Sequence, residues 1–421
     1  MKVLIAGSGA REHALAWAVS RTGDRVYCAP GNAGTGSLAS NIPVDPEDTA
    51  AVLSAVREFG IDLVVVGPEG PLAAGLVDAL EAERVPVFGP AKKAAQLECS
   101  KAFARSFSER WGVPSARTAR LSDSAALRRF IDENRGRRIV LKKSGLAAGK
   151  GVLESDDPSE LAAFGEAVLA SDELLAEDFL VGRELSVFAL CDRSDHLVLP
   201  ACADHKKAGM GDTGPNTGGM GAVCPVPYAD AGAMARIERE IVEPTFRGME
   251  AEGLRYRGLL FFGIMITEDG PKLLEYNVRF GDPETQSLLP LLETSASEIL
   301  HGVARGALCS LRARFSGETA CGVVIAAPGY PGNYPKGLSV ELSAGGEPAS
   351  GGGKAGALLF HASTSSGIDG RLRTGGGRCF TAVGIGENWI AAREAAYSLA
   401  SRVGFEGAWF RPDIGSKIYG L

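Results

Sequence analysis

Three short apolar runs in the first hundred residues each enter a glycine-rich turn and lead into a helical pattern. The runs are 2–6, 25–29 and 62–66, and their turns are 7–13, 30–35 and 67–70. Apolar strands that alternate with helices are typical of a parallel sheet covered on both faces. The sequence therefore predicts a doubly wound α/β domain over residues 1–99, with these turns gathered at the carboxyl ends of the strands, where ligands bind.

The first turn, Gly7-Ser8-Gly9-Ala10-Arg11-Glu12, partly matches a dinucleotide fingerprint. Free N–H groups at a helix start favour an anion there. However, Glu12 stands where the third glycine is expected, and the strand 25–29 does not end in an acid that could hold a ribose. An NAD-dependent oxidoreductase is therefore disfavoured, and a generic anion-binding or structural turn is favoured.

Length and charge exclude several classes of protein. A chain of 421 residues is expected to form two to four domains. The net charge of −7 and the lack of long basic runs argue against nucleic-acid binding. No apolar run approaches the roughly 20 residues that a membrane span needs. The eight cysteines are scattered without a CxxC pair, which favours reduced thiols and a cytoplasmic protein.

A glycine- and alanine-rich loop lies between two expected strands, 139–141 and 151–154. The first strand leads into Lys142-Lys143-Ser144-Gly145, and the loop spans 145–151. Such a loop can lie over a triphosphate and donate backbone N–H groups while lysines neutralise charge. It is not a Walker A loop, because no G-x-x-x-x-G-K-[ST] enters a helix. Nucleotide binding is favoured, with a mobile hairpin as the alternative.

The stretch 204–222 contains six glycines interleaved with Asp, His, Lys, Asn and Thr. A flexible linker is one interpretation. A loop of this length inside a domain is usually functional, however, and clustered glycine indicates backbone that approaches a ligand closely. A helix is expected after it over 231–252. Beyond residue 315, strands are expected at 319–327, 358–362 and 378–385, with one helix at 389–402.

A β-hairpin is predicted where the apolar run 259–266 meets a polar turn and a returning strand over 273–280. Side chains alternate along a strand, so Glu275, Asn277 and Arg279 share one face. Carboxylate and amide oxygens are ligands that Mg²⁺ accepts beside phosphate oxygens. A guanidinium would hold a carboxylate or a phosphate. Taken alone, E-x-N-x-R could also be an exposed strand face with a salt-bridged arginine.

Eight segments carry a resemblance to a known family along essentially the whole chain. They are G-S-G-A-R-E-H-A-L-A at 7–16, P-G-N-A-G-T at 30–35, V-G-P-E at 66–69, S-K-A-F at 100–103, S-G-L-A-A-G-K-G-V at 144–152, D-H-K at 204–206, D-T-G-P-N-T-G-G-M-G-A at 212–222 and E-Y-N-V-R-F-G-D-P-E-T-Q at 275–286. Together they closely resemble the ATP-grasp ligases, and within them the phosphoribosylamine–glycine ligases of purine biosynthesis.

The resemblance implies a multidomain α/β and α+β protein with an ATP-grasp fold. The expected parts are an N-terminal doubly wound substrate-binding domain (1–99), a central ATP-grasp domain (100–118 and 176–315), a lid (119–175) and a C-terminal α+β domain (316–421). The implied reaction joins glycine to 5-phosphoribosylamine through glycyl phosphate, at the expense of ATP, with Mg²⁺ or Mn²⁺. A monomer without nucleic-acid or membrane partners is expected.

The resemblance also implies roles for individual residues. The nucleotide would contact Lys101, Lys142, Gly149, Lys150, Gly151, Glu177, Phe179, Leu180 and Glu184. The metal would be held by Glu275 and Asn277. The acceptor and glycine would contact Gly9, Arg11, Glu12, Gly31, Asn32, Gly34, Thr35, Pro68, Glu69, Asn216, Gly218 and Gly219. Catalysis would use Arg279, Asp204, Lys206 and Asp212, and no residue is assigned as a general base.

Three departures from the family pattern leave alternatives open. Lys143-Ser144 stands where the family commonly has Ala-Asp, the segment from 158 to 177 is short, and the strand 259–266 lacks an acid. The first departure could change the phosphate contacts of the lid. A nucleotide sensor without activity and an ATP-grasp ligase for another amine or acid are the remaining hypotheses.

Overall fold

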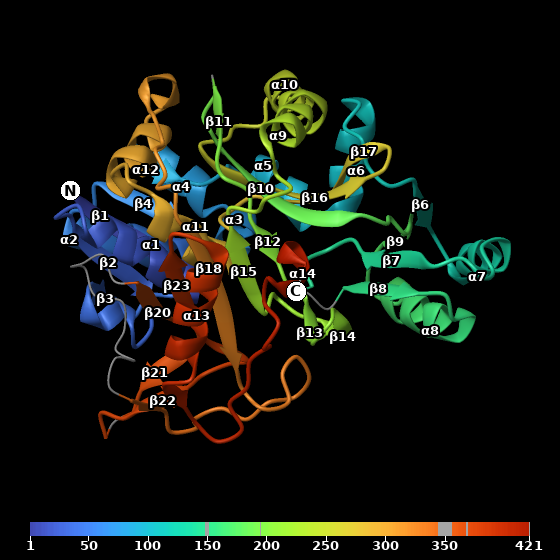
Figure 1. Cartoon of the computed structure of the whole chain (residues 1–421). Helices are drawn as coiled ribbons and strands as arrows, with labels where there is room; N and C mark the ends of the chain where they lie inside the picture. Colours follow the sequence, from blue (N-terminus) through green and yellow to red (C-terminus); the bar gives the residue numbers. More distant parts are fainter. Residues whose placement is uncertain (148–150, 194, 344–355, 368, 421) are drawn as a thin grey trace.

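A computed structural model describes residues 1–147, 151–193, 195–343, 356–367 and 369–420. Gly149 and Lys150, expected in the lid loop, lie outside these residues. The N-terminal part (blue in Figure 1) packs beside the C-terminal part (red), and a small lid with helices of its own projects from this body. Within the described ranges, no helix is long and apolar enough to cross a membrane.

The N-terminal sheet is entirely parallel, with the strand order β3-β2-β1-β4-β5. Its strands are β1 (Lys2–Gly7), β2 (Arg25–Pro30), β3 (Ser40–Asn41), β4 (Leu63–Val66) and β5 (Val87–Phe88). Its helices are α1 (Ala10–Ser20), α2 (Thr49–Phe59), α3 (Glu69–Ala74), α4 (Leu76–Ala82) and α5 (Lys92–Cys99), with a 3₁₀ turn η1 (Thr35–Ser37). The order reverses at β1, which confirms the doubly wound sheet and puts the turns after β1 and β4 at the switch point.

The lid is an antiparallel sheet with a separate hydrophobic core. Its strands are β6 (Thr118–Leu121), β7 (Ile139–Lys143), β8 (Val152–Ser155) and β9 (Leu174–Asp178), in the order β6-β9-β7-β8. The helices α7 (Ser124–Glu133) and α8 (Pro158–Leu169) pack on it through Leu127, Leu141 and Leu161. Since this cluster is distinct from the core clusters of the body, the lid packs as a unit of its own.

The central sheet has the order β11-β10-β16-β17. Its strands are β10 (Arg183–Cys191), β11 (His196–Val198), β16 (Gly258–Thr267) and β17 (Gly270–Asn277), and α6 (Lys101–Arg110) lies beside it. The register shifts between Gly263 and Ile264, which pair with Glu275 and Leu273, so Leu274 forms a β-bulge. The expected strand to residue 280 was too long, because β17 ends at Asn277 and Arg279 lies beyond it.

The helix expected over 231–252 is confirmed, but a π-helical turn divides it in the middle. It consists of α9 (Ala231–Ile237), a π-helical turn η2 (Glu238–Val242) and α10 (Glu243–Ala251). Pro244 near the start of α10 has no N–H to donate, so the regular hydrogen-bond ladder cannot run through it. The chain continues through α11 (Glu284–Leu288), η3 (Leu289–Leu291), α12 (Ala296–Ala304) and η4 (Leu308–Ser310).

The C-terminal sheet includes two strands from the glycine-rich stretch 204–222. Its order is β12-β15-β18-β23-β20, with β12 (Ala203–Asp204), β15 (Gly221–Cys224), β18 (Thr319–Ala326), β20 (Ala357–His361) and β23 (Arg378–Gly386). Between β12 and β15 the chain forms the hairpin β13 (Lys207–Gly209) and β14 (Thr213–Asn216). The stretch is therefore anchored at both ends.

The helix α13 (Trp389–Ala400) packs on β18 and β23 of this sheet. The remaining short elements are β19 (Glu341–Leu342), β21 (Thr364–Ser366), β22 (Leu372–Thr374), β24 (Val403–Gly404) and α14 (Ser416–Tyr419). The C-terminal part thus has both strands and helices, as expected.

Candidate active site

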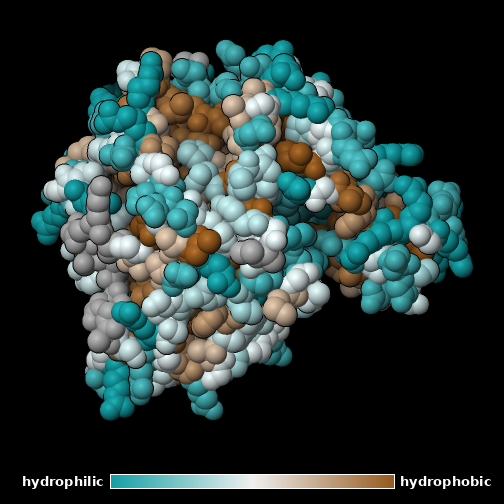
Figure 2. Space-filling view, viewed as in Figure 1, coloured by the Kyte–Doolittle hydropathy of each residue, from teal (hydrophilic) through white to brown (hydrophobic). Residues whose placement is uncertain are grey.

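A cavity of about 1250 Å³ lies where the N-terminal turns, the lid, the central hairpin and the C-terminal part meet. Figure 2 shows apolar residues among polar ones on the surface between the body and the projecting lid. Most of the residues assigned from the sequence lie in the cavity wall. They are Gly9, Arg11, Glu12, Pro68, Glu69, Lys101, Lys142, Gly151, Glu177, Phe179, Leu180, Glu184, Asp204, Lys206, Asp212, Asn216, Gly218, Glu275, Asn277 and Arg279.

Glu275 is an ionised carboxylate among lysines. Its Oε1 lies 3.4 Å from Lys206 Nζ, and the same ammonium lies 2.5 Å from Glu184 Oε1. Burial alone would raise the pKa of Glu275, but Lys206, Lys142 and Lys101 lower it to about 2. The carboxylate is therefore available as a hard oxygen ligand at neutral pH.

Asn277 and Arg279 are arranged by an acid that the sequence did not reveal. Arg279 Nη2 donates to Asn277 Oδ1 at 3.1 Å and lies 2.8 Å from Glu98 Oε1. The other oxygen of Glu98 accepts from the backbone N–H of Val278 at 2.7 Å. Glu69 Oε2 lies 3.5 Å from Arg279 Nε. Glu98 therefore orients the arginine and the end of β17 together.

Lys142 is aimed into the cavity by a buried charge cluster. Its Nζ lies 2.7 Å from Glu177 Oε2 and donates to the carbonyl of Leu274 at 3.3 Å. Arg105 clamps the same carboxylate with bonds of 2.6 and 3.0 Å and donates to Leu274 O at 2.6 Å. The Glu177 side chain thus supports Lys142. Arg105 was missed, although it lies one helical turn after Lys101 on the same helix face.

The departure at Lys143-Ser144 does not bring extra charge to the cavity. Lys143 Nζ lies 3.6 Å from Asp172 Oδ2, and Ser144 Oγ accepts from the N–H of Ala102 at 3.2 Å. Among the described residues, the wall includes Lys142 but neither of these two. Alternation along β7 explains the position of Lys143, because successive side chains point to opposite faces, whereas Ser144 lies beyond β7 and faces the start of α6.

Asp212 lies at the cavity margin, but its carboxylate is engaged by the C-terminal part. Arg411 Nη1 lies 3.1 Å from Asp212 Oδ1 and Lys417 Nζ lies 3.2 Å from Asp212 Oδ2. Arg411 also donates to the carbonyl of Lys207 at 2.8 Å. These contacts fix the β13–β14 hairpin, and they give Asp212 a structural task beside the catalytic one assigned from the sequence.

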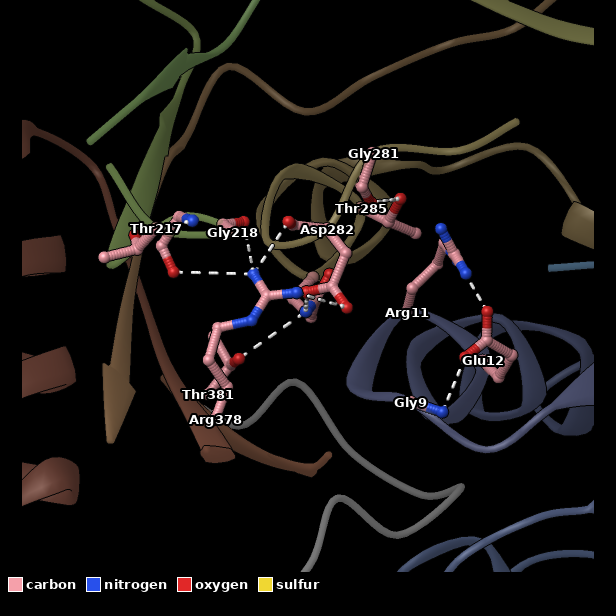
Figure 3. A network of polar contacts seen from close by, with 12 residues as sticks. Gly9, Arg11, Glu12, Thr217, Gly218, Gly281, Asp282, Thr285, Arg378 and Thr381 are labelled. Atoms are coloured by element: carbon pink, nitrogen blue, oxygen red, sulfur yellow. Dashed lines mark hydrogen bonds and ion pairs between the residues drawn. The ribbon is translucent and has the colours of Figure 1, made fainter. Parts of the chain in front are cut away.

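Glu12 fills the space beside the first glycine turn (Figure 3). Its Oε2 accepts from the N–H of Gly9 at 2.6 Å. A Cβ placed on Gly7 or Gly67 would lie only 2.6 or 2.1 Å from the Glu12 side chain. The carboxylate therefore occupies the anion site at the start of α1, which leaves no room there for the pyrophosphate of a dinucleotide.

Five residues assigned to substrate binding lie outside the cavity wall: Gly31, Asn32, Gly34, Thr35 and Gly219. The amide of Asn32 is fully engaged within the protein. Its Oδ1 accepts from the N–H groups of Gly34 and Thr35 at 2.9 and 3.0 Å, and its Nδ2 donates to the carbonyl of His361 at 2.9 Å. The turn at 31–35 thus packs against the C-terminal strand β20, behind the wall.

Family models match nearly the entire chain. The N domain of phosphoribosylglycinamide synthetase matches residues 1–98, its ATP-grasp (A) domain 99–285 and its C domain 320–417. The chain belongs to the phosphoribosylglycinamide synthetase family. It is therefore an ATP-grasp enzyme, which confirms the expected fold class and removes the oxidoreductase alternative.

Individual relatives agree with this assignment. The phosphoribosylamine–glycine ligase of Mesorhizobium japonicum is 43% identical over 99% of this chain and 98% of its own length. The trifunctional purine biosynthetic protein adenosine-3 of Gallus gallus is 41% identical over 99% of this chain, which corresponds to 42% of that protein. The crystal structure of the Thermotoga maritima phosphoribosylamine–glycine ligase is 36% identical, with a TM-score of 0.84, over 98% of this chain and all of that one.

A more distant structure supports the fold alone. The biotin carboxylase domain of the Hydrogenobacter thermophilus 2-oxoglutarate carboxylase, determined with MgADP, is 18% identical with a TM-score of 0.71, over 97% of this chain and 91% of that one.

Proposed function

We propose that the protein joins glycine to 5-phosphoribosylamine and forms glycinamide ribonucleotide, ADP and phosphate, through glycyl phosphate. Family membership along the chain supports this reaction. The observation that carries it within the molecule is the convergence of Glu275, Asn277, Lys142, Lys206 and Arg279 on one cavity. Phosphoryl transfer between two anions requires such a group of cations and hard oxygen ligands.

ATP would lie between the lid sheet and the central hairpin. We assign Phe179 and Leu180 to the base, Glu184 to the ribose, and Lys142 and Lys101 to the phosphates. All five residues line the cavity. The division into residues 1–99, 100–118 with 176–315, 119–175 and 316–421 is our proposal for the domains, except that the lid extends to Asp178, because β9 (Leu174–Asp178) is an inner strand of the lid sheet. It places the nucleotide between the second and third of them.

The donor set on β17 fits Mg²⁺ or Mn²⁺. Glu275 and Asn277 provide two oxygens, and among the described residues no group of three or more His, Cys, Asp or Glu could hold a metal ion alone. Mg²⁺ is commonly bound by one or two protein ligands together with substrate phosphates and water. When bound, the ion would offset the charge of the nucleotide phosphates. Lys206 would then release the Glu275 carboxylate.

The proposed reaction has two steps. A carboxylate oxygen of glycine attacks the γ-phosphorus of ATP, the bond from that phosphorus to the bridging oxygen breaks, and ADP leaves. The amine of phosphoribosylamine then attacks the carbonyl carbon of glycyl phosphate. The carbon–oxygen bond breaks, phosphate leaves with the former carboxylate oxygen, and the amine loses a proton. Lys142 and Arg279 would hold the reacting anions in line.

The acceptor would enter from the N-terminal turns. Gly9, Arg11, Pro68 and Glu69 reach the cavity, and Asp204, Lys206, Asn216 and Gly218 form the adjoining wall. We propose that the N-terminal set faces phosphoribosylamine and that the adjoining set faces glycine. Gly31, Asn32, Gly34 and Thr35 would support them from behind, since Asn32 also donates to the carbonyl of Ser8 at 2.9 Å.

Isotope transfer tests the proposed intermediate. Glycine labelled with ¹⁸O in its carboxylate should transfer one labelled oxygen to inorganic phosphate in each turnover, and ADP should form only when glycine is present. Label that appears in AMP would indicate an adenylate and overturn the glycyl phosphate route. ADP release that does not depend on glycine, or that requires another amino acid, would overturn the substrate assignment.

The state of the chain in the cell is a separate proposal. We infer a cytoplasmic monomer. The described structure contains eight free cysteines, most of them buried, which suits a reducing compartment. A mass close to 43.8 kDa by sedimentation equilibrium is the expected result, and a dimer mass would contradict it.

A further inference from the structure

Arg378, the first residue of β23, reaches from the C-terminal sheet into the cavity wall (Figure 3). Its Nη1 donates to the carbonyls of Gly218 at 2.5 Å, Gly219 at 3.4 Å and Asp282 at 2.9 Å. Its Nη2 lies 3.2 Å from Asp282 Oδ2. One guanidinium thus holds two loops that are more than 60 residues apart in the chain.

These two loops are in direct contact next to Asp204. Gly219 has a φ of +108°, and a Cβ placed there would lie 2.4 Å from Pro283 Cδ and 2.7 Å from Asp204 Oδ1. Any shift of one loop would therefore displace the other. A second residue of the C-terminal part contributes, because the Tyr330 hydroxyl accepts from the N–H of Gly218 at 3.0 Å.

The region that Arg378 enters is rich in buried acids. Burial raises the pKa of Asp204 well above its usual range, and the neighbouring Glu284 adds to this effect. Asp282 has its other oxygen held by Gln286 Nε2 at 2.8 Å. Arg378 thus brings a positive charge from the C-terminal part into contact with this acidic region, where it pairs with Asp282.

We propose that Arg378 is a positioning residue for the glycyl half of the reaction. It acts through the Gly218–Gly219 backbone and the Asp282 turn, so the C-terminal part completes the site and does not merely pack against it. The inference rests on the proposed function. The residues assigned to the nucleotide are held by contacts that do not involve Arg378. Glu177, itself paired with Arg105, orients Lys142. Lys206 holds Glu275.

Arg378→Met tests the proposal by a separation of kinetic constants. We expect kcat/KM for glycine to fall about 100-fold, the loss that a misplacement of about 1 Å can cause. The Kd of Mg-ATP, measured by titration calorimetry without glycine, should stay within about twofold of the wild type. Arg378→Lys retains the charge but lacks the planar fork that bridges the two loops, so it should be intermediate.

Two further variants complete the design. Arg371→Met is the matched control, because this arginine of the same part is 74% exposed, and all its constants should match the wild type. Tyr330→Phe removes the acceptor of the Gly218 N–H and serves if Arg378→Met does not fold. It should also lower kcat/KM for glycine and leave the Kd of Mg-ATP unchanged, with a smaller loss. Constants unchanged in these variants, or equal losses for ATP and glycine, would overturn the positioning role. Wild-type protein without glycine-dependent ADP release would overturn the proposed function itself.

Discussion

Arg105 and Glu177 form a bidentate ion pair, with nitrogen–oxygen distances of 2.6 and 3.0 Å, and both residues are almost fully buried. The pair joins α6 of the body to β9 of the lid. Because Glu177 also holds Lys142, and Arg105 holds the bulge carbonyl of Leu274, the lid and the strand of Glu275 share one charged anchor.

Removal of Arg105 should therefore destabilise the protein and weaken nucleotide binding together. Arg105→Met leaves the Glu177 carboxylate buried with one partner fewer, and loss of one partner of a buried pair costs about 3–5 kcal/mol. Urea unfolding measures the change in the free energy of unfolding. Arg110→Met on the same helix breaks an exposed pair with Glu252, so its effect should stay below about 1 kcal/mol. Equal effects of the two substitutions would contradict the anchor.

Glu275→Gln should lower turnover by orders of magnitude. The substitution keeps the shape of the side chain but removes the charge that makes the oxygen a strong metal ligand. Turnover and Mn²⁺ affinity in the presence of ATP are to be measured side by side. Glu268→Gln, at the exposed turn of the same hairpin, is the control and should change neither. If Mn²⁺ affinity is unaffected in Glu275→Gln, the metal assignment is wrong.

The two neighbouring lid lysines should behave differently. Lys142→Ala should raise the KM for ATP at least tenfold, because its ammonium lies in the cavity, and one lost charge-assisted contact is worth about 1.5–3 kcal/mol. Lys143→Ala should leave the KM within about twofold, since Lys143 pairs with Asp172. A large effect of Lys143→Ala would show that this lysine turns toward the nucleotide during turnover.

Acid should loosen the contact between α1 and β20. Burial lowers the pKa of His13 to about 3 and that of His361 to about 4. The unfolded chain therefore binds these protons first, and stability present above pH about 6.5 should decline as the pH falls toward 4, by up to about 1.4 kcal/mol per pH unit for each group.

Urea midpoints at pH 7.5 and 5.0 check this prediction. The His13→Gln variant, which cannot take up the proton, should lose less stability between the two values than the wild type. His301→Gln, on α12, should follow the wild type. Identical pH dependence in the wild type and His13→Gln would exclude the histidine as the cause.

Local pattern was sufficient for much of the site. Alternation along a strand correctly placed Glu275 and Asn277 on the cavity side of β17, and the turns that contain Gly9 and Pro68 reach the cavity as expected. Local irregularities within a helix or a strand were harder to predict. The π-helical turn at 238–242 and the bulge at Leu274 depend on how neighbouring elements compete for the same backbone groups.

The sequence by itself determined the family, the order of strands and helices, and the residue types that the reaction needs, because backbone geometry imposes its periodicity on neighbouring residues. Only the tertiary structure decided which charges meet. Glu98, Arg105 and Arg378 look like ordinary helix or strand residues in the sequence, and their partners lie 72 to 181 positions away. A buried charge must find an opposite charge or a hydrogen-bonding group, and long-range packing alone decides which one it meets.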